Sequence, residues 1–429
     1  MGNELMHMLG LVVAVLGGLI ALRFLLRYPE IALALFIAAY VLKGGINVGL
    51  LNLTVVMLII SILGFVLPVL RGKKKVQFRI TRADVWLWLF MIIWIGGILY
   101  SPRPAVGIER TFRILAITIA PYFLTRIFLT QSQQVKRFLV TLFLSAVAVS
   151  LVLVVGAGVA SFQNGRMMFL EANPIPEASL LAMGVLIAVI GTLEGVFRKR
   201  WIRWLSLGTT PILIYGILLT GSRGPLVSIT VAAIFYFAAI FRKRAGVVLA
   251  VGLAFVILGM GVVNFDILPH SLTTRYNPLT WGTSMSVNKR MTLYQSIWQE
   301  TQQQPILGLG TGSMNLAENI FLEVYANVGI VGLLCFLAFL YSVARHGLRY
   351  LVRVYPHERG MTRGLGLLVV TVAVALFMDK QVSYALDGDK DLFVYLAILV
   401  NIGYWSKFRL SSKDGVLQGG ASPNGIANC

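Results

Sequence analysis

Charged side chains are scarce in this sequence, and their scarcity excludes an ordinary soluble protein. Only 13% of the 429 residues are charged, whereas soluble domains carry about 25%. Apolar residues make up 58% of the chain, and its mean hydropathy is +0.82. Such a composition is typical of a protein that crosses a membrane many times, because the apolar runs leave no room for a separate soluble domain. We therefore predict an all-α, polytopic integral membrane protein.

Cysteine and histidine are also rare, which removes two common kinds of site. The two cysteines are Cys335, inside an apolar run, and Cys429, the last residue. They form neither a disulfide framework nor a CxxC metal motif. The four histidines make no ligand pair at helical spacing. The sequence thus predicts no metal site and no cofactor. A basic region before the first apolar run is missing too, so we interpret the N-terminus as a first spanning helix rather than a signal peptide.

Apolar runs long enough to cross a bilayer, about 20 residues each, are in contrast abundant. We expect 12–13 transmembrane helices in a single domain over 1–410, with a polar Gly- and Ser-rich tail at 411–429 that we predict to be disordered in the cytoplasm. The candidate runs lie near 5–22, 29–46, 50–70, 84–101, 110–128, 138–160, 177–196, 204–221, 225–241, 246–265, 318–344, 362–379 and 391–406.

The net charge of +20 is explained by the orientation of these helices. Alternate connections hold 26 of the 37 basic residues, and by the positive-inside rule they face the cytoplasm. The other side holds 12 acidic against 11 basic residues. The charge therefore indicates topology and contact with anionic lipid, and no nucleic-acid partner is needed to explain it.

One outer connection is long, at 266–317, and loops of this length are usually functional or disordered. Within it, residues 288–304 place Met291, Tyr294, Ile297 and Trp298 on one helical face. We predict an amphipathic helix on the outer membrane surface, followed by a glycine-rich turn, GLGTG at 308–312, into the next spanning helix.

Three arginines stand out among the few outer charges: Arg166, Arg223 and Arg290. Arg223 lies between two uncharged segments, with a glycine on each side of its Ser-Arg pair. The guanidinium fork suits phosphate, because it donates parallel hydrogen bonds and keeps its charge. Each arginine also has a simpler explanation: Arg223 as a snorkelling turn residue, Arg290 on a solvated helix face, and Arg166 as a loop charge. Three further arginines, Arg103, Arg110 and Arg113, surround the start of the fifth span.

Two carboxylates at the start of the eleventh span are candidate general bases. Glu318 opens the segment, and Glu323 lies one turn deeper. Partial desolvation would raise the pKa of either group toward neutrality, although stabilisation by the helix dipole also explains a carboxylate there. The DGDKD stretch at 387–391 has the residue types of a metal site. We interpret it as a solvated hairpin tip, because no matching His or Asp cluster stands near.

Three stretches together resemble the O-antigen ligase/polymerase superfamily of bacterial membrane glycosyltransferases. They are GSRG at 221–224, the segment from Arg290 through Trp298 to PILGLGTGS at 305–313, and ENIFLEVYANVGIVGLLCFL at 318–337. Their order and the long outer loop match as well, and the detailed match covers roughly residues 200–345.

The resemblance implies a GT-C-like enzyme on the outer face of the cytoplasmic membrane. Such an enzyme moves a glycan from undecaprenyl diphosphate to a hydroxyl of an acceptor glycan lipid, with inversion and without metal or nucleotide sugar. Arg223 and Arg290 would bind the diphosphate, with Arg166 as a third match and Ser222 and Asn319 lining the site. A chain-length regulator of polysaccharide assembly is an implied partner.

One departure affects the assignment. The family motif normally opens with His-Asn, whose histidine is implicated as the base, whereas this chain has Glu318-Asn319. Glutamate can replace histidine as a base when its pKa is raised. The change weakens a strict ligase assignment, so we favour a polymerase of O-antigen or exopolysaccharide units, with a ligase acting on lipid A core or protein as the alternative. A lipid-linked sugar flippase and a non-catalytic assembly partner are the readings from other classes, but the inverted repeats and mid-membrane charges of a transporter are not seen.

Overall fold

The computed structural model describes residues 16–241, 276 and 285–403, apart from 40, 42–46, 49–50, 74–75, 77, 156–159, 164–165, 170–172, 198, 315–317, 357–360 and 384–385. Helices dominate this part of the chain, as the composition predicted, and two short β-hairpins are its only sheets. The expected span at 246–265 and the tail at 411–429 lie outside the described residues.

The helices follow the apolar runs of the sequence closely. Eight helical segments in the described part are long and apolar enough to cross a membrane. The helices are α2 (Pro29–Ala38), α3 (Leu53–Leu70), α4 (Arg82–Gly96), α5 (Pro104–Arg113), α6 (Ala120–Phe128), α7 (Ser132–Val155), α8 (Pro174–Leu193), α9 (Arg200–Leu219), α10 (Arg223–Ile240), α13 (Met285–Thr301), α14 (Ile320–Arg349) and α15 (Met361–Ser383), with unlabelled helical segments at 16–27 and 390–403. The π-helical turns η2 (Ile114–Ile119) and η4 (Tyr350–Val354) continue α5 and α14.

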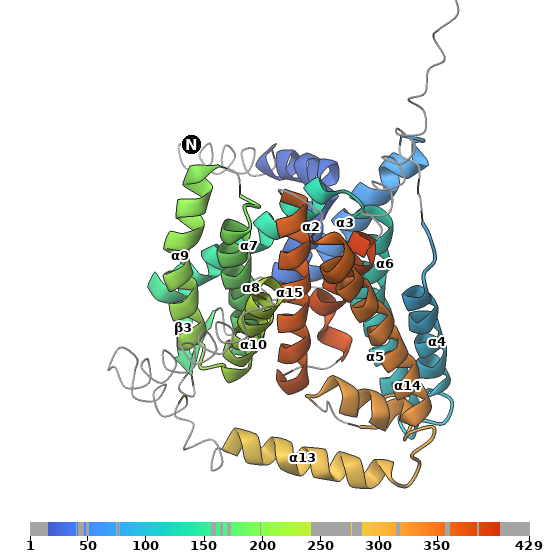
Figure 1. The fold of residues 1–429 in the computed structure, drawn as a ribbon. Coiled ribbons are helices and arrows are strands. Elements are labelled where there is room, and N and C mark those ends of the chain that lie inside the picture. Colours follow the sequence, from blue (N-terminus) through green and yellow to red (C-terminus); the bar gives the residue numbers. More distant parts are fainter. Residues whose placement is uncertain are drawn as a thin grey trace, which may run out of the picture.

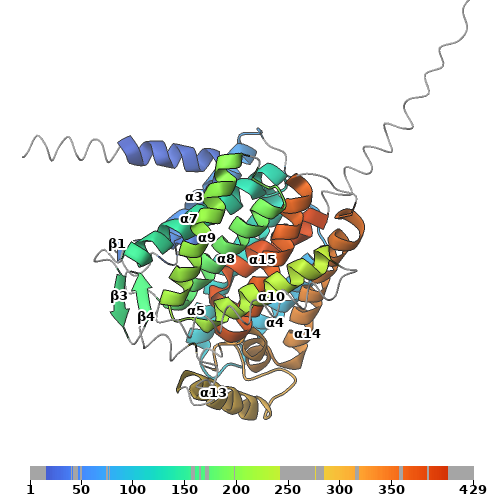
Figure 2. The ribbon, with the colours of Figure 1, turned by 60° about the vertical axis from the view of Figure 1, so that its left-hand side comes forward.

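Two helices form the centre of the bundle. Figure 1 and Figure 2 both show α8 and α15 running through its middle, with the other long helices around them. Most of the side chains of α8 are buried, although its sequence is as apolar as that of the lipid-facing helices. A helix that is apolar all round fits such a position, because it meets protein on every side.

The second predicted span differs from the structure. The apolar run near 29–46 forms α2, which is helical for only ten residues. Ten residues rise about 15 Å, half the thickness of a hydrocarbon core. A short hairpin, β1 (Asn47–Val48) with β2 (Leu51–Asn52), then leads directly into α3. Hydropathy alone did not reveal that α2 is too short to span a membrane. The apolar side chains of α2 are buried against other helices, and such residues cannot be told from lipid-facing ones by hydropathy.

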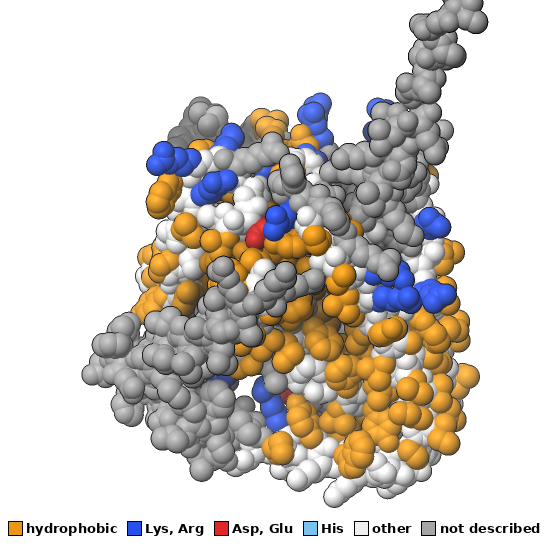
Figure 3. Space-filling view, viewed as in Figure 1, with side chains coloured by type: hydrophobic (Ala, Val, Ile, Leu, Met, Phe, Trp, Pro, Cys, Tyr) orange, Lys and Arg blue, Asp and Glu red, His pale blue; other side chains and the backbone are white. Residues whose placement is uncertain are grey.

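Basic residues gather at one end of the bundle. Figure 3 shows Lys and Arg side chains mostly in the upper part of the molecule, above a broad apolar surface. The acidic residues at that end have partners: Glu30 pairs with Arg137 at 2.6 Å, and Asp84 with Arg126 at 2.9 Å. By the positive-inside rule, the predicted orientation places this end on the cytoplasmic side.

A glycine-rich loop holds a kink in α14 at the opposite end. The helix is interrupted at Val328 and Gly329, where the backbone leaves helical geometry. The freed carbonyls accept hydrogen bonds from the 308–312 loop, since the Leu309 and Gly310 N–H groups donate to Ala326 and Asn327. On its other side, the loop donates from the Thr311 N–H to Gly97, after α4. The predicted glycine-rich turn is therefore a clamp between α4 and α14.

We expect Gly310→Ala to destabilise the protein by about 3 kcal/mol, from a left-handed residue plus overpacking. Gly310 has φ +91, and an added Cβ would lie 2.6 Å from the Ser101 Cα atom. The check is the thermal unfolding midpoint of the purified protein in detergent. Gly208→Ala, in α9 with no atom within 4 Å of an added Cβ, is the matched control. Equal midpoints for the two variants would contradict the clamp.

Candidate functional site

Four helix ends meet at the end of the bundle opposite the basic one. The Ser222 hydroxyl, before α10, donates to the Pro174 carbonyl at the start of α8. In α8, the Ser179 hydroxyl donates to Asp379 of α15 at 2.6 Å. The Asn319 side chain, before α14, donates to the Gln381 carbonyl near the end of α15. These bonds bring the GSRG segment and the Glu318-Asn319 segment to the same end of the molecule.

Arg290 and Glu318 form an ion pair there. The Arg290 Nε atom lies 2.6 Å from the Glu318 carboxylate, and both side chains are partly exposed. Arg290 is the predicted diphosphate ligand and Glu318 the predicted base. The two predicted residues are therefore hydrogen-bonded to each other. Figure 3 shows Lys or Arg side chains and an acidic side chain in a hollow near the lower end of this face.

Glu318 also has an unusual backbone. Its φ is +52, the only positive value at a non-glycine residue in the described part. A left-handed conformation at such a residue costs about 1–2 kcal/mol. Strained residues of this kind cluster at functional sites, because the surrounding structure must hold them in place. The strain therefore marks Glu318 as a candidate functional residue independently of the sequence motif.

The long loop contributes α13 as a lid-like helix across this end. In Figure 1 and Figure 2, α13 lies crosswise beneath the bundle. The helix covers Met285–Thr301, three residues earlier at each end than predicted. Ile297 is fully buried against Ala326 of α14, whereas Met291 and Trp298 of the predicted apolar face are half exposed. The predicted face is thus divided between contact with protein and an outward surface.

Tyr294 joins α13 to the Glu318 segment. Its hydroxyl donates to the Glu318 carbonyl oxygen at 3.4 Å. Burial raises the pKa of the Tyr294 hydroxyl, with the nearby Glu318 charge adding to the rise and Arg290 opposing it. The hydroxyl therefore stays protonated at neutral pH and remains a donor.

The remaining predicted substrate ligands differ in their surroundings. Arg223 is the first residue of α10 and is half-buried, while Ser222 beside it is buried. Asn319 caps α14, since its side-chain oxygen accepts the Phe321 and Leu322 N–H groups. Arg166 lies on β4 (Arg166–Phe169), paired with β3 (Ala160–Gln163) in a hairpin instead of the expected loop. Its side chain lies outside the described part of the structure.

Glu323, the second candidate base, is enclosed. It is 2% exposed, and its carboxylate accepts the Leu386 N–H group at 2.8 Å. Leu386 belongs to the short 3-10 turn η5 (Leu386–Gly388). Glu323 therefore fixes the connection after α15 to α14, whereas Glu318 is accessible from outside. On this geometry Glu318 is the better placed of the two carboxylates to reach an acceptor.

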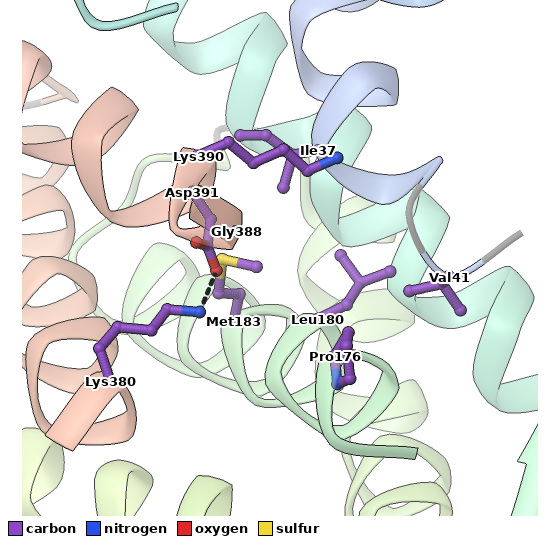
Figure 4. Close-up of a pocket in the computed structure, with 9 residues that line it drawn as sticks. All are labelled: Ile37, Val41, Pro176, Leu180, Met183, Lys380, Gly388, Lys390 and Asp391. Atoms are coloured by element: carbon purple, nitrogen blue, oxygen red, sulfur yellow. Dashed lines mark ion pairs between the residues drawn. The ribbon is translucent and has the colours of Figure 1, made fainter. Parts of the chain in front are cut away.

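The interpretation of DGDKD as a solvated tip was wrong. Asp389 and Asp391 are buried, and Lys380 of α15 lies between them, 3.7 Å and 3.1 Å from their carboxylates. Figure 4 shows the pair with Asp391 beside a cavity of about 20 Å³. The stretch folds inward because Lys380 supplies a buried counter-charge, and no local pattern in the sequence indicates that Lys380 and the aspartates meet. Within the described residues, no group of metal-binding side chains converges.

Sequence reasoning gave too little weight to Arg110. It lies on α5, whose Gly107 packs against Thr311 of the clamp loop. Its Nη1 atom is buried and has no hydrogen-bond partner among the described residues. A guanidinium nitrogen of this kind, on a helix that contacts the 308–312 loop, is a further candidate ligand for an anionic oxygen. Arg113, one turn on, is instead paired with Glu109 on the exposed face.

The three stretches singled out in the sequence fall within one family match. Residues 208–337 match the family model described as O-antigen ligase. This segment is similar to the O-antigen ligase family, as the motifs of the sequence indicated. No curated protein matches the chain.

The O-antigen ligase match confirms the resemblance that the sequence motifs indicated. It runs from α9 into α14 and so includes Arg223, α13, the clamp loop and Glu318. Arg110, Arg166 and Lys380 lie outside it. The eight long apolar helices of the described part make this a multi-pass membrane protein, and its residues 208–337 are similar to the O-antigen ligase family.

Proposed function

We propose that the protein is a metal-independent, inverting glycosyltransferase that polymerises repeat units carried on undecaprenyl diphosphate. The observation that carries the proposal is the Arg290–Glu318 ion pair, at the end of the bundle where α10 also begins. A diphosphate donor needs fixed positive charge, and an acceptor hydroxyl needs a nearby base. The site lies opposite the basic end, which supports a location on the extracytoplasmic face.

In the proposed reaction, Glu318 acts as the base and Arg290 stabilises the leaving group. The acceptor hydroxyl oxygen attacks the anomeric carbon of the donor glycan from the face opposite the diphosphate. As the new C–O bond forms, the bond from the anomeric carbon to the diphosphate oxygen breaks. Glu318 takes the hydroxyl proton, and Arg290 and Arg223 stabilise the negative charge that builds on the departing diphosphate. Asn319 and Ser222 position these residues through the backbone bonds described above.

The ion pair also suggests how the base is released for use. Without donor, the Arg290 guanidinium is engaged by Glu318. A diphosphate carries more negative charge than one carboxylate and offers more oxygens, so it competes for the same fork. Donor binding would thus free the carboxylate at the moment when an acceptor can be used. Hydrolysis of the donor by water would be limited as well, because the Glu318 carboxylate stays paired with Arg290 until the donor binds.

We expect Glu318→Gln to lower turnover by about 100-fold or more, the usual contribution of a general base. Donor affinity should stay the same or rise, because Arg290 loses its competing carboxylate. The measurements are single-turnover transfer rates and donor binding with purified lipid-linked oligosaccharide. Glu300→Gln, at an exposed position on the same helix as Arg290, is the control. Unchanged turnover would move the base elsewhere, with Glu323 the next candidate.

Polymerase and ligase activities are separated by the length of the product. With lipid-linked repeat units alone, a polymerase gives a ladder of products on the carrier lipid. A ligase gives a single transfer, and only when lipid A core or another acceptor is supplied. We expect ladders, because glutamate replaces the motif histidine. A single transfer product would favour the ligase, which is the name of the matched family. A chain-length regulator would shift the ladder without being needed for transfer.

A further inference from the structure

A cleft at the basic end of the bundle has no role in the proposed chemistry. It has a volume of about 720 Å³ and lies between the start of α4 and the last turns of α14. The straight part of α14 after its kink, residues 330–349, rises about 30 Å, which is the thickness of a hydrocarbon core. The Arg349 end of the cleft therefore lies about one membrane thickness along α14 from the kink, at the end of the bundle away from the Arg290–Glu318 pair.

Arginines converge on this cleft from two elements. Arg345 and Arg349 follow Tyr341 by one and two turns on the same face of α14, and Arg79 and Arg82 approach from the start of α4. All four are exposed. Among the described residues, Arg82 and Arg345 have no carboxylate partner, and the same holds for Arg349. In Figure 3, basic side chains gather at the right-hand side, above the apolar surface.

The backbone beneath these arginines is rigid. Thr81 and Asp84 form a capping box at the start of α4, and Asp84 is paired with Arg126. Arg126 in turn donates to the Arg79 carbonyl at 3.1 Å. The positive end of the α4 dipole adds to the attraction for an anion at this position. The cations therefore stand on a fixed frame rather than on a loose surface loop.

An apolar groove continues from the cleft along α4. It has a volume of about 520 Å³ and shares Thr81, Arg82 and Trp86 with the cleft. Its other walls include Val85 and Leu89, one turn apart and both exposed. Trp86 lines both the cleft and the groove, and Tyr341 lines the cleft; tryptophan and tyrosine are enriched at membrane interfaces. A free phosphate would make no use of such an extension, whereas a lipid has an acyl chain to fill it.

We propose that this cleft binds the phosphate headgroup of an anionic phospholipid of the cytoplasmic leaflet, with one acyl chain along α4. Guanidinium groups bind the phosphodiester through paired hydrogen bonds. Basic pockets between transmembrane helices on the cytoplasmic side bind such headgroups. The bound lipid joins α4 to α14, the same two helices that the glycine-rich loop clamps at the opposite end.

The test uses the full-length protein in detergent, titrated with dioleoyl phosphatidylglycerol and followed by native mass spectrometry. Wild type should bind this lipid in preference to dioleoyl phosphatidylcholine. The double variant Arg345→Gln/Arg349→Gln should weaken binding by about 30-fold, from roughly 1 kcal/mol per arginine. The control is Lys199→Gln/Arg200→Gln, which removes two exposed charges at the same end outside the cleft. It should change affinity less than threefold.

Two results would overturn the proposal. Equal losses in both double variants would mean diffuse attraction to the surface and no site. Full displacement of the lipid by millimolar sodium phosphate would mean a site for free phosphate. Folding is checked by the unfolding midpoint in lipid-free detergent. If the Arg345/Arg349 variant unfolds early, Arg82→Gln on α4 replaces it, and wild-type affinity in that variant also counts against the cleft.

Discussion

Arg290→Lys is expected to lower glycan transfer by about 100-fold or more while the protein stays folded. The substitution keeps the positive charge and therefore an attraction to Glu318, which lies 2.6 Å from the guanidinium in the wild type. What it removes is the planar fork that binds two phosphate oxygens at once. Loss of one preorganised donor to a developing anion typically costs about 100- to 1,000-fold in turnover.

Single-turnover transfer with purified lipid-linked donor measures this effect. Lys289→Gln is the control, since Lys289 is exposed on the same helix beside Arg290 and has no assigned role. Arg223→Lys should also impair transfer, because it removes the guanidinium fork of the arginine at the start of α10. Wild-type turnover in the Arg290→Lys protein would contradict a bidentate grip on diphosphate. The Arg290–Glu318 pair would then be structural.

Lys380→Met is expected to reduce the free energy of unfolding by about 3–5 kcal/mol, the usual cost of removing one partner of a buried ion pair. Lys380 is 1% exposed and lies close to two buried aspartates, Asp389 and Asp391. Without the lysine, carboxylates remain in an apolar interior with less counter-charge. The ends of α15 and of the following helix would then separate.

Thermal unfolding in detergent measures this loss, with Lys289→Met as an exposed lysine for comparison. Lys380→Met/Asp391→Asn should recover part of the stability, because it removes one of the stranded charges together with its partner. An unchanged midpoint in Lys380→Met would contradict the buried network. A lower midpoint with no recovery in the double variant would point to lost packing instead.

Local sequence features predicted the helices well, since apolar run length is a local property. The runs near 138–160, 177–196 and 204–221 became α7, α8 and α9 with shifts of a few residues. The motifs also singled out the candidate site residues, because Arg223, Arg290 and Glu318 lie in short stretches of distinctive type. Hydropathy failed at α2, where burial against protein and exposure to lipid select the same apolar residues.

Within the part of the chain that the structure describes, the amino-acid order was enough to determine a polytopic helical protein, its charge asymmetry and the similarity of residues 208–337 to the O-antigen ligase family. Apolar run length and short motifs depend only on neighbours within about twenty residues. Contacts between distant segments required the tertiary structure. Arg290 meets Glu318 across 28 positions, the 308–312 loop fills the kink of α14 against α4, and the DGDKD stretch turns inward to Lys380. Such contacts leave no periodic pattern in a single sequence. They form only when the helices pack and buried charges are paired with opposite charges.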